Sequence, residues 1–275
     1  MAHNGFPPLA LADWRATRDT LHGYAKVLGA IRGALTPKQK HWWHISLCVA
    51  SNGLTTTGIP FGKYRFELRL DLATHCLVIQ AGQAQPTHIP LGAQSSAALG
   101  AQIMAALEPL DIRPDIDKAR LGDATPVHYD RVAVERFWRA LLRIDGALKQ
   151  FREKLGANTS PVQLWPHHFD LATNWFSGRQ VPGTDPADEE TSDEQMNFGF
   201  ATGDDGIPDP YFYITAYPLP GQLVKTKLPP GAIWHTQGWT GAVLPYAALA
   251  KVEQPEENLL GFLQHVHSAG SHLMK

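Results

Sequence analysis

Cysteine is scarce in this chain. Only Cys48 and Cys76 occur among 275 residues, and both lie in apolar stretches typical of strands. A disulfide framework needs several cysteines in an oxidising compartment. We therefore interpret both as small, reduced core residues, with a catalytic cysteine as the lesser alternative.

The chain also lacks a charge excess, a long apolar run and a secretory signal. Its net charge is −2, so it has no basic field for a polyphosphate backbone. No apolar run approaches the roughly 18 residues of a membrane span. Residues 1–19 show no basic start followed by an apolar core. We expect a cytoplasmic protein of bacterial type without a nucleic-acid or membrane partner.

Several catalytic motifs are missing as well. The sequence has no glycine-rich loop followed by Lys-Ser/Thr, no G-x-G-x-x-G after a strand and no G-x-S-x-G elbow. It has no C-x-x-C pair either. These absences argue against kinase-like, dinucleotide-dependent and serine-hydrolase functions.

What is present is a repeated order of helices and strands. Apolar residues at three- and four-residue steps predict helices over 12–35, 94–108, 130–155 and 256–268. Apolar runs and alternating patterns predict strands over 41–49, 54–59, 64–71 and 76–80, and again over 164–176, 196–201, 211–217 and 239–244. Residues 51–53 form a turn of the Asn-Gly kind.

The order helix, four strands, helix therefore occurs twice. The run His44-Ile45-Ser46-Leu47 has the position in the first half that His168-Phe169-Asp170-Leu171 has in the second. We predict an α+β fold with an internal duplication and mainly antiparallel sheet. The halves span residues 1–110 and 130–275, with a connector at 111–129, and pack as one pseudo-symmetric unit.

The second half carries the most chemistry. On a strand over 164–176, His168 and Asp170 would share one face, whereas His167 would face the core as a structural histidine. A histidine and a carboxylate two residues apart can form an acid–base pair or ligate a metal. With His235 they resemble the H-x-D…H facial triad of non-haem iron oxygenases. The resemblance fails beyond these three residues, because no arginine follows His235 closely as it does in the oxoacid-dependent members. Two alternatives stay open: a divalent transition metal held by His168, Asp170 and His235, or an acid–base pair of His168 and Asp170.

Other polar and aromatic residues would surround this pair. We predict ligand contacts from Asn174, Asn197, Tyr211, Tyr213, His235 and Trp239. The acidic, proline-rich stretch 179–194 would be a mobile loop that covers the site. In the first half, the alternating charges of residues 65–71 predict a solvated strand face, with anion binding as the alternative.

Four segments resemble a bacterial family known only as a domain of unknown function. They are residues 163–170, 193–200, 210–213 and 234–245, and the resemblance extends to the Trp14 helix and the His41-Trp42-Trp43-His44 run. It implies a single full-length unit in a bacterial cytoplasm, and it carries no activity, cofactor or catalytic residue across.

The functional hypothesis is a small-molecule site on the polar sheet face of the second half. His168 would be its general base or metal ligand, with Asp170 as partner. The alternative is a non-catalytic ligand-binding or protein-interaction module that uses the same tyrosine and tryptophan surface.

Overall fold

The computed structural model describes residues 5–125, 127–188 and 190–274. Pro126 of the predicted connector and Glu189 of the predicted acidic loop lie outside them. The chain forms two compact units. Unit 1 comprises residues 1–13, 139–162 and 170–275, and unit 2 comprises residues 14–138 and 163–169.

Unit 2 is a sheet with two helices, α1 (Arg15–Leu35) and α2 (Ser96–Leu107). Its strands run in the order β1-β2-β4-β5-β6, with β3 also paired to β4, and the pairs are antiparallel. The strand bounds are Cys48–Ala50, Gly53–Thr55, Ile59–Phe61, Tyr64–Asp71, Cys76–Ala81 and Thr87–Pro90 for β1 to β6. The unit also contains β7 (Gln163–Trp165) and the 3-10 segments Lys40–Ile45, Glu108–Leu110 and Lys118–Leu121.

The core of unit 2 follows from two periodicities. On α1, Leu21, Tyr24 and Leu28 recur at helical spacing and are fully buried. On β4, the alternate residues Phe66 and Leu68 are buried, and their neighbours are more exposed. The Tyr24 hydroxyl lies 2.7 Å from the carbonyl oxygens of both Gly92 and Gln94, and it donates its single proton to this pair of acceptors.

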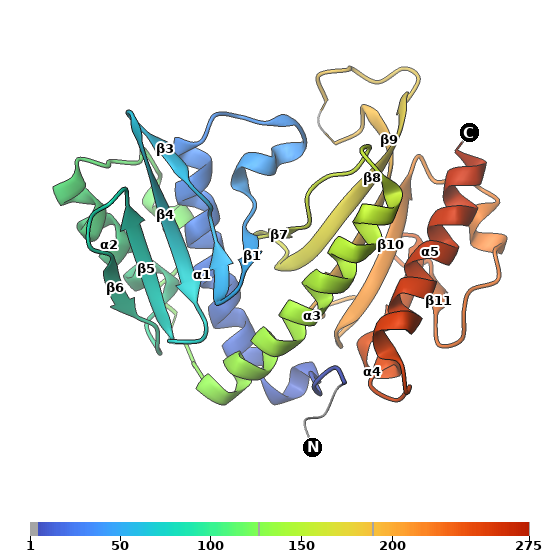
Figure 1. Cartoon of the computed structure of the whole chain (residues 1–275), viewed down its shortest axis with the longest axis horizontal. Coiled ribbons are helices and arrows are strands. Elements are labelled where there is room, and N and C mark those ends of the chain that lie inside the picture. Colours follow the sequence, from blue (N-terminus) through green and yellow to red (C-terminus); the bar gives the residue numbers. More distant parts are fainter. Residues whose placement is uncertain (1–4, 126, 189, 275) are drawn as a thin grey trace. The chain divides into compact units, whose positions relative to one another are not determined.

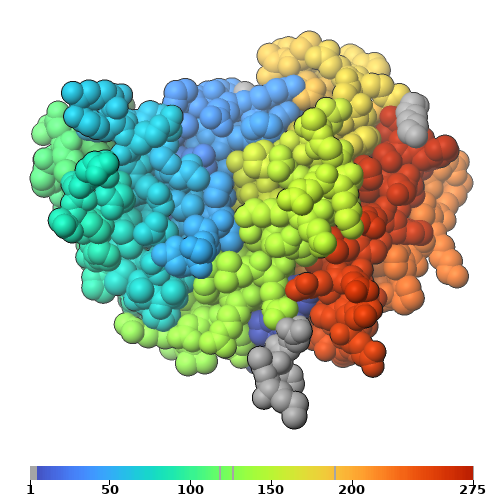
Figure 2. Space-filling view, in the orientation of Figure 1, coloured from blue at the N-terminus to red at the C-terminus, as the bar shows by residue number. Residues whose placement is uncertain are grey.

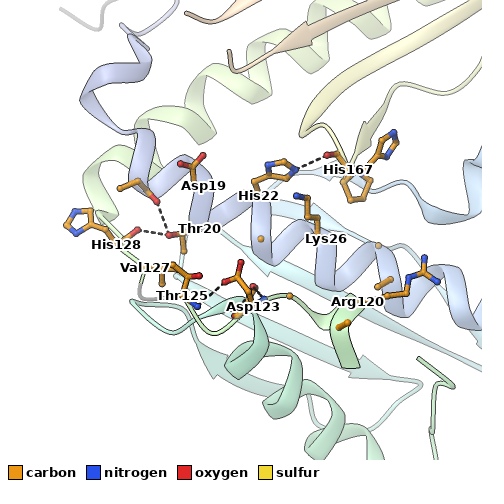
Figure 3. Close-up of a pocket in the computed structure, with 18 of the residues that line it drawn as sticks. Asp19, Thr20, His22, Lys26, Arg120, Asp123, Thr125, Val127, His128 and His167 are labelled. Atoms are coloured by element: carbon orange, nitrogen blue, oxygen red, sulfur yellow. Dashed lines mark hydrogen bonds between the residues drawn. The ribbon is translucent and has the colours of Figure 1, made fainter. Parts of the chain in front are cut away.

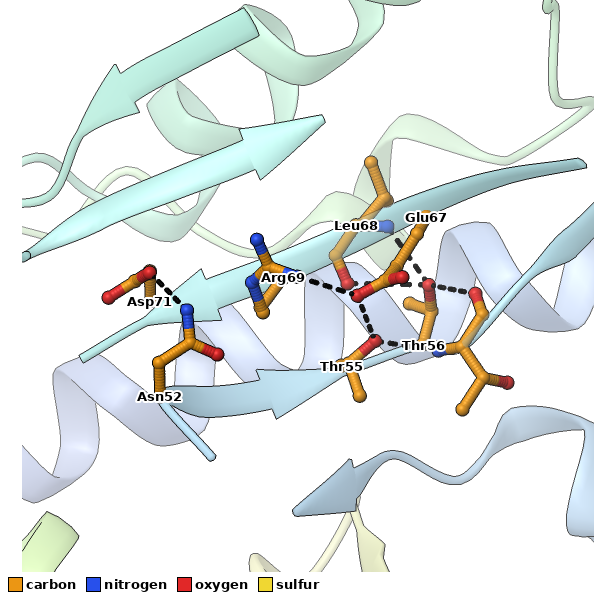
Figure 4. A network of polar contacts seen from close by, with 8 residues as sticks. Asn52, Thr55, Thr56, Glu67, Leu68, Arg69 and Asp71 are labelled. Carbon is orange, nitrogen blue, oxygen red and sulfur yellow. Dashed lines mark hydrogen bonds and ion pairs between the residues drawn. The ribbon is translucent and has the colours of Figure 1, made fainter. Parts of the chain in front are cut away.

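The charged face of β4 is an internally paired network (Figure 4). The Glu67 carboxylate accepts hydrogen bonds from Thr55 Oγ1 at 2.8 Å and from Arg69 Nη1 at 3.2 Å. Asp71 accepts from Asn52 and from the backbone of the following turn. Thr55 and Asn52 thus donate to β4 from its neighbours, whereas Arg69 and Glu67 pair along β4 itself.

Unit 1 contains a second antiparallel sheet, in the order β11-β12-β10-β9-β8. These strands span Asp170–Gln180 (β8), Asp193–Ala201 (β9), Tyr211–Tyr217 (β10), Ile233–His235 (β11) and Gly241–Pro245 (β12). The helices are the later part of α3 (Arg131–Leu155), the short α4 (Tyr246–Leu249) and α5 (Pro255–Leu273), with 3-10 turns at Leu11–Asp13 and Leu223–Lys225.

One face of this sheet packs against helices (Figure 1). Phe151 of α3 lies 4.8 Å from Phe198 of β9, measured between ring centroids. At Gly270 of α5, a Cβ would lie 2.5 Å from the Met196 side chain, so this helix approaches β9 closely. The outer flank of α5 forms part of the surface in Figure 2. The opposite face of the sheet carries the polar residues discussed below.

The α+β class, the predominantly antiparallel sheets and the helices are confirmed. Internal duplication stays a prediction, as does the division at residues 110 and 129. Residues 111–125 and 127–129 belong to unit 2, whereas the first 13 residues belong to unit 1. None of the helices in the described ranges is long and apolar enough to cross a membrane.

Two predicted strands are wrong because non-glycine residues take left-handed backbone conformations. His41 and Trp42, at φ 55° and 60°, turn most of the predicted 41–49 strand into a 3-10 segment. Phe169, at φ 58°, ends the predicted 164–176 strand, leaving β7 and β8 on either side. Positive φ interrupts the alternation of side chains that a strand requires.

Candidate functional site

The predicted site residues separate into two groups. His168 is exposed and lies on the Pro166–Phe169 turn of unit 2. The Phe169 amide closes this turn by donating a hydrogen bond to the Trp165 carbonyl at 2.8 Å. The expectation that His168 shares a strand face with Asp170 is therefore wrong. The others all belong to unit 1: Asp170, Asn174, Asn197, Tyr211, Tyr213, His235 and Trp239.

Strand register brings most of this second group onto one face. Asn174 pairs with Asn197, and Tyr213 pairs with Gly199. Residues directly opposite each other point to the same side of a sheet. We call the surface formed by Asp170, Asn197, Tyr211, Tyr213 and Trp239 the polar face; Asn174 lies on the same side, where its amide donates to Gln195.

At the centre of the polar face, Tyr213 joins two polar side chains. Its hydroxyl donates to the Asp170 carboxylate, which is only 8% exposed, and it is hydrogen bonded to the Asn197 side chain. Burial first, and then the charge and hydrogen bond of Asp170, raise the pKa of Tyr213 well above its usual range. The phenol is therefore protonated and acts as a donor at neutral pH.

A glycine makes room for this tyrosine. A Cβ at Gly199 would lie 2.4 Å from the hydroxyl oxygen of Tyr213, so the ring lies directly over the β9 backbone. Any larger residue at position 199 would push the ring off this position. The sheet thus fixes the hydroxyl of Tyr213 by backbone contact as well as by hydrogen bonds.

Tyr211 makes a parallel arrangement with a different acid. Its hydroxyl donates to Asp204 Oδ2 at 2.5 Å, and the Asp204 Oδ1 also accepts from the amides of Gly206 and Ile207 at 2.8 Å. Burial alone would raise the pKa of Asp204, but these hydrogen bonds and the nearby His235 lower it. Asp204 is consequently an anion at neutral pH that its hydrogen bonds stabilise.

Three aromatic rings border these groups. The centroids of Tyr211, Tyr213 and Trp239 lie 6.2, 6.3 and 6.4 Å apart, and His235 lies 4.5 Å from Trp239. His235 Nε2 donates to the Gln237 carbonyl at 2.7 Å, which holds the imidazole beside the indole. The polar face therefore combines hydrogen-bonding groups with an aromatic wall.

The amide group of Asn197 on this face is only partly hydrogen bonded. The Asn197 side-chain oxygen is buried and has no hydrogen-bond partner among the described residues. A buried acceptor without a donor costs about 1 to 3 kcal/mol. This atom is the strongest indication on the polar face that another molecule completes the arrangement.

Unit 2 contains a cavity that the sequence did not indicate. A groove of about 1060 Å³ runs along α1 between residues 119–125 and 127–128 on one side and the Pro166-His167 turn on the other (Figure 3). Small residues of α1 form its floor. At Gly29 a Cβ would lie 2.7 Å from Pro166 Cγ, so the turn packs directly on the helix backbone. We call this cavity the α1 groove.

His22, Lys26 and His167 line the same part of the α1 groove. His22 Nε2 donates to the His167 carbonyl at 3.1 Å, and its ring stacks on Phe169 with centroids 5.4 Å apart. Burial, followed by the charge of Lys26, lowers the pKa of His22 to about 4. Burial, followed by the charges of His168 and then Lys26, lowers the pKa of His167. Both imidazoles are neutral at pH 7, so Lys26 carries the charge of this cluster.

A family model matches residues 6–275. The chain belongs to DUF5996, a family of unknown function. No curated protein and no solved structure matches this DUF5996 chain. Membership thus confirms the resemblance to a domain of unknown function and assigns no residue a role.

The metal hypothesis for the DUF5996 chain gains no support from side-chain geometry. Within residues 5–125, 127–188 and 190–274, no group of three or more His, Cys, Asp or Glu side chains is arranged to hold a metal ion. Asp170 and His235 instead have Tyr213 and Gln237 as hydrogen-bond partners.

The residues of the α1 groove were missed for two reasons. Lys26 lies on the polar side of an amphipathic helix, where a lysine is ordinarily a surface residue. His167 was interpreted as structural, yet it lines the groove of the DUF5996 chain on an exposed turn. The available signal was the run of small residues on α1, Gly23, Gly29 and Ala30, which lets other segments approach the helix.

Proposed function

We propose that the polar face of unit 1 binds a small molecule that carries hydroxyl or amino groups. The observation that carries this proposal is the buried Asn197 oxygen, which lacks a donor. It adjoins Tyr213 and Asp170, so the ligand would meet a carboxylate acceptor and a phenol as well. The neighbouring rings of Tyr211 and Trp239 would contact its apolar or flat part.

The same groups support acid–base chemistry as a more specific form of this proposal. Asp170 would be the base, because its carboxylate is buried and hydrogen bonded. Tyr213 would hold that carboxylate in place and remain protonated. We leave His168 out of this pair, since the positive φ of Phe169 separates it from the strand that begins at Asp170.

The test is a melting-temperature screen with monosaccharides, cyclic polyols and primary amines. A ligand from this panel should raise the melting temperature of the wild type by mass action. Asn197→Ser should lose that shift, whereas Asn258→Ser, on the exposed side of α5, should keep it. If no compound stabilises the wild type, or if Asn197→Ser responds as the wild type does, the proposed site is wrong.

The alternative of a protein-interaction module makes a different prediction in the same experiment. It predicts no shift with any compound of the panel. The cytoplasmic location, the bacterial origin and the absence of a nucleic-acid partner stay predictions from composition and resemblance.

A further inference from the structure

Two cations, Lys26 and Arg120, line the α1 groove. Lys26 is exposed in the groove, and its ammonium group has no hydrogen bond or ion pair with any residue in the described parts of the chain. Burial, with a smaller contribution from the positive charge of Lys26, lowers the pKa of the His22 and His167 imidazoles. Arg120, also exposed, lines the same cavity without a side-chain partner among those residues.

The acids of the groove are engaged elsewhere. Asp19 accepts a hydrogen bond from Arg18 Nε at 2.6 Å, and Asp123 accepts one from the Thr125 amide at 3.0 Å. Figure 3 shows Asp123 and Thr125 across the groove from His22 and His167. Neither carboxylate forms an ion pair with Lys26, so its ammonium group is available to a ligand in the groove.

Two glycines of α1 let other segments pack on the helix at either side of this space. Gly23 allows Ser96 to approach α1, since a Cβ at this position would lie 3.2 Å from Ser96 Cβ. Gly29 does the same for Pro166 on the other side. The cavity between them, at about 1060 Å³, is in the size range of small-molecule sites.

We propose that the α1 groove binds a small molecule through a carboxylate or phosphate group, with Lys26 as its counterion and Arg120 as a second cation in the groove. A charge-assisted hydrogen bond from an ammonium group suits either kind of anion. The neutral imidazoles of His22 and His167 offer hydrogen bonds to the rest of the ligand. This site lies in unit 2 and is independent of the function proposed for unit 1.

The test is calorimetric titration of the full chain with inorganic phosphate, citrate and ribose 5-phosphate. We expect at least one of them to bind, and more weakly as ionic strength rises. Lys26→Met should weaken that binding by about tenfold or more. Lys154→Met removes an exposed helix lysine outside the groove and should leave the affinity unchanged.

The pattern of binding identifies the anion. Binding of inorganic phosphate and ribose 5-phosphate without citrate assigns a phosphate ligand, and binding of citrate alone assigns a carboxylate. No binding of any probe at 10 mM, a concentration about tenfold above a 1 mM Kd, overturns the proposal. Equal affinity of the wild type and Lys26→Met overturns it as well.

A second measurement keeps the proposal testable if a variant folds poorly. In the wild type, a bound anion beside Lys26 would favour the charged form of His22. Titration of the His22 ring by NMR should therefore show a higher pKa in the presence of the binding anion. An unchanged pKa of His22 would contradict an anion at Lys26.

Discussion

The polar face of unit 1 and the α1 groove of unit 2 differ in the group that each offers to a ligand, a hydrogen-bond acceptor in the first and a cation in the second. On the polar face, Tyr213 and Tyr211 each bond an acid, and one amide oxygen lacks a donor. In the α1 groove, Asp19 and Asp123 accept hydrogen bonds from Arg18 and Thr125, and Lys26 forms no ion pair with a described residue. The comparison teaches that a candidate site can be recognised by a polar or charged group to which the neighbouring side chains give no hydrogen bond or ion pair. It also predicts ligands of different character, a donor-rich molecule for the first and an anion for the second.

The largest expected effect concerns the floor of the polar face. Gly199→Ala places a Cβ against the Tyr213 ring in a buried strand and should lower the free energy of unfolding by about 2 to 3 kcal/mol. Gly146→Ala is the matched control, because nothing lies within 4 Å of its Cβ position on α3. That control should gain about 0.5 to 1 kcal/mol from helix propensity. Urea unfolding of both variants measures the difference, and equal effects would contradict the close packing.

The two tyrosine–acid pairs should differ in strength. Tyr213→Phe removes a donor from the buried Asp170 and should cost about 1 to 2 kcal/mol of unfolding free energy. Tyr211→Phe should cost less than about 1 kcal/mol, because the exposed Asp204 keeps its backbone donors. Urea unfolding at pH 7 compares them. A larger loss for Tyr211→Phe would show that the ranking by burial is wrong.

Acid should weaken unit 2 through His22. Its folded pKa of about 4 lies below the value of 6.5 expected for an unfolded chain, so the unfolded state binds more protons between these limits. Stability from this residue is complete above pH 6.5 and falls as the pH decreases toward 4. Because His22 is half-buried, the loss should be about 1 kcal/mol.

Unfolding free energies at pH 7 and pH 4.5 test this expectation. His22→Gln should reduce the difference between the two pH values, although His75, His167 and His267 also have lowered pKa values. An unaltered pH dependence in His22→Gln would assign the loss to the other histidines.

The smallest expected effect on stability is that of Lys26→Met. Since Lys26 is exposed and has no ion pair within the described parts of the chain, its replacement should change the free energy of unfolding by less than about 0.5 kcal/mol. A loss above 1 kcal/mol in urea unfolding would indicate a structural role for this lysine.

Side-chain periodicity predicted those parts of the molecule in which backbone conformation is regular. The strand over Tyr211–Tyr217 and its tyrosine face are as expected, and so is the buried stripe of α1. The predicted strand over 164–176 is interrupted at Phe169, because an alternating sequence pattern does not reveal a non-glycine residue with positive φ. The supposed His168–Asp170 pair depended on that residue.

The α1 groove was beyond prediction for another physical reason. A cavity depends on which segments approach a helix, and glycines such as Gly23 and Gly29 permit an approach without naming the partner. Ser96 and Pro166, which lie against them, are distant in sequence. The position of Asn197 on its sheet face is different, because it depends on strand phase alone.

The most direct measurement is a melting-temperature comparison of the wild type, Asn197→Ser and Lys26→Met with both classes of ligand. The account predicts that Asn197→Ser loses only the shift caused by the hydroxyl or amino compound. It predicts that Lys26→Met loses only the shift caused by phosphate or carboxylate. Loss of both shifts in one variant, or of neither in both, would contradict two separate sites of opposite character.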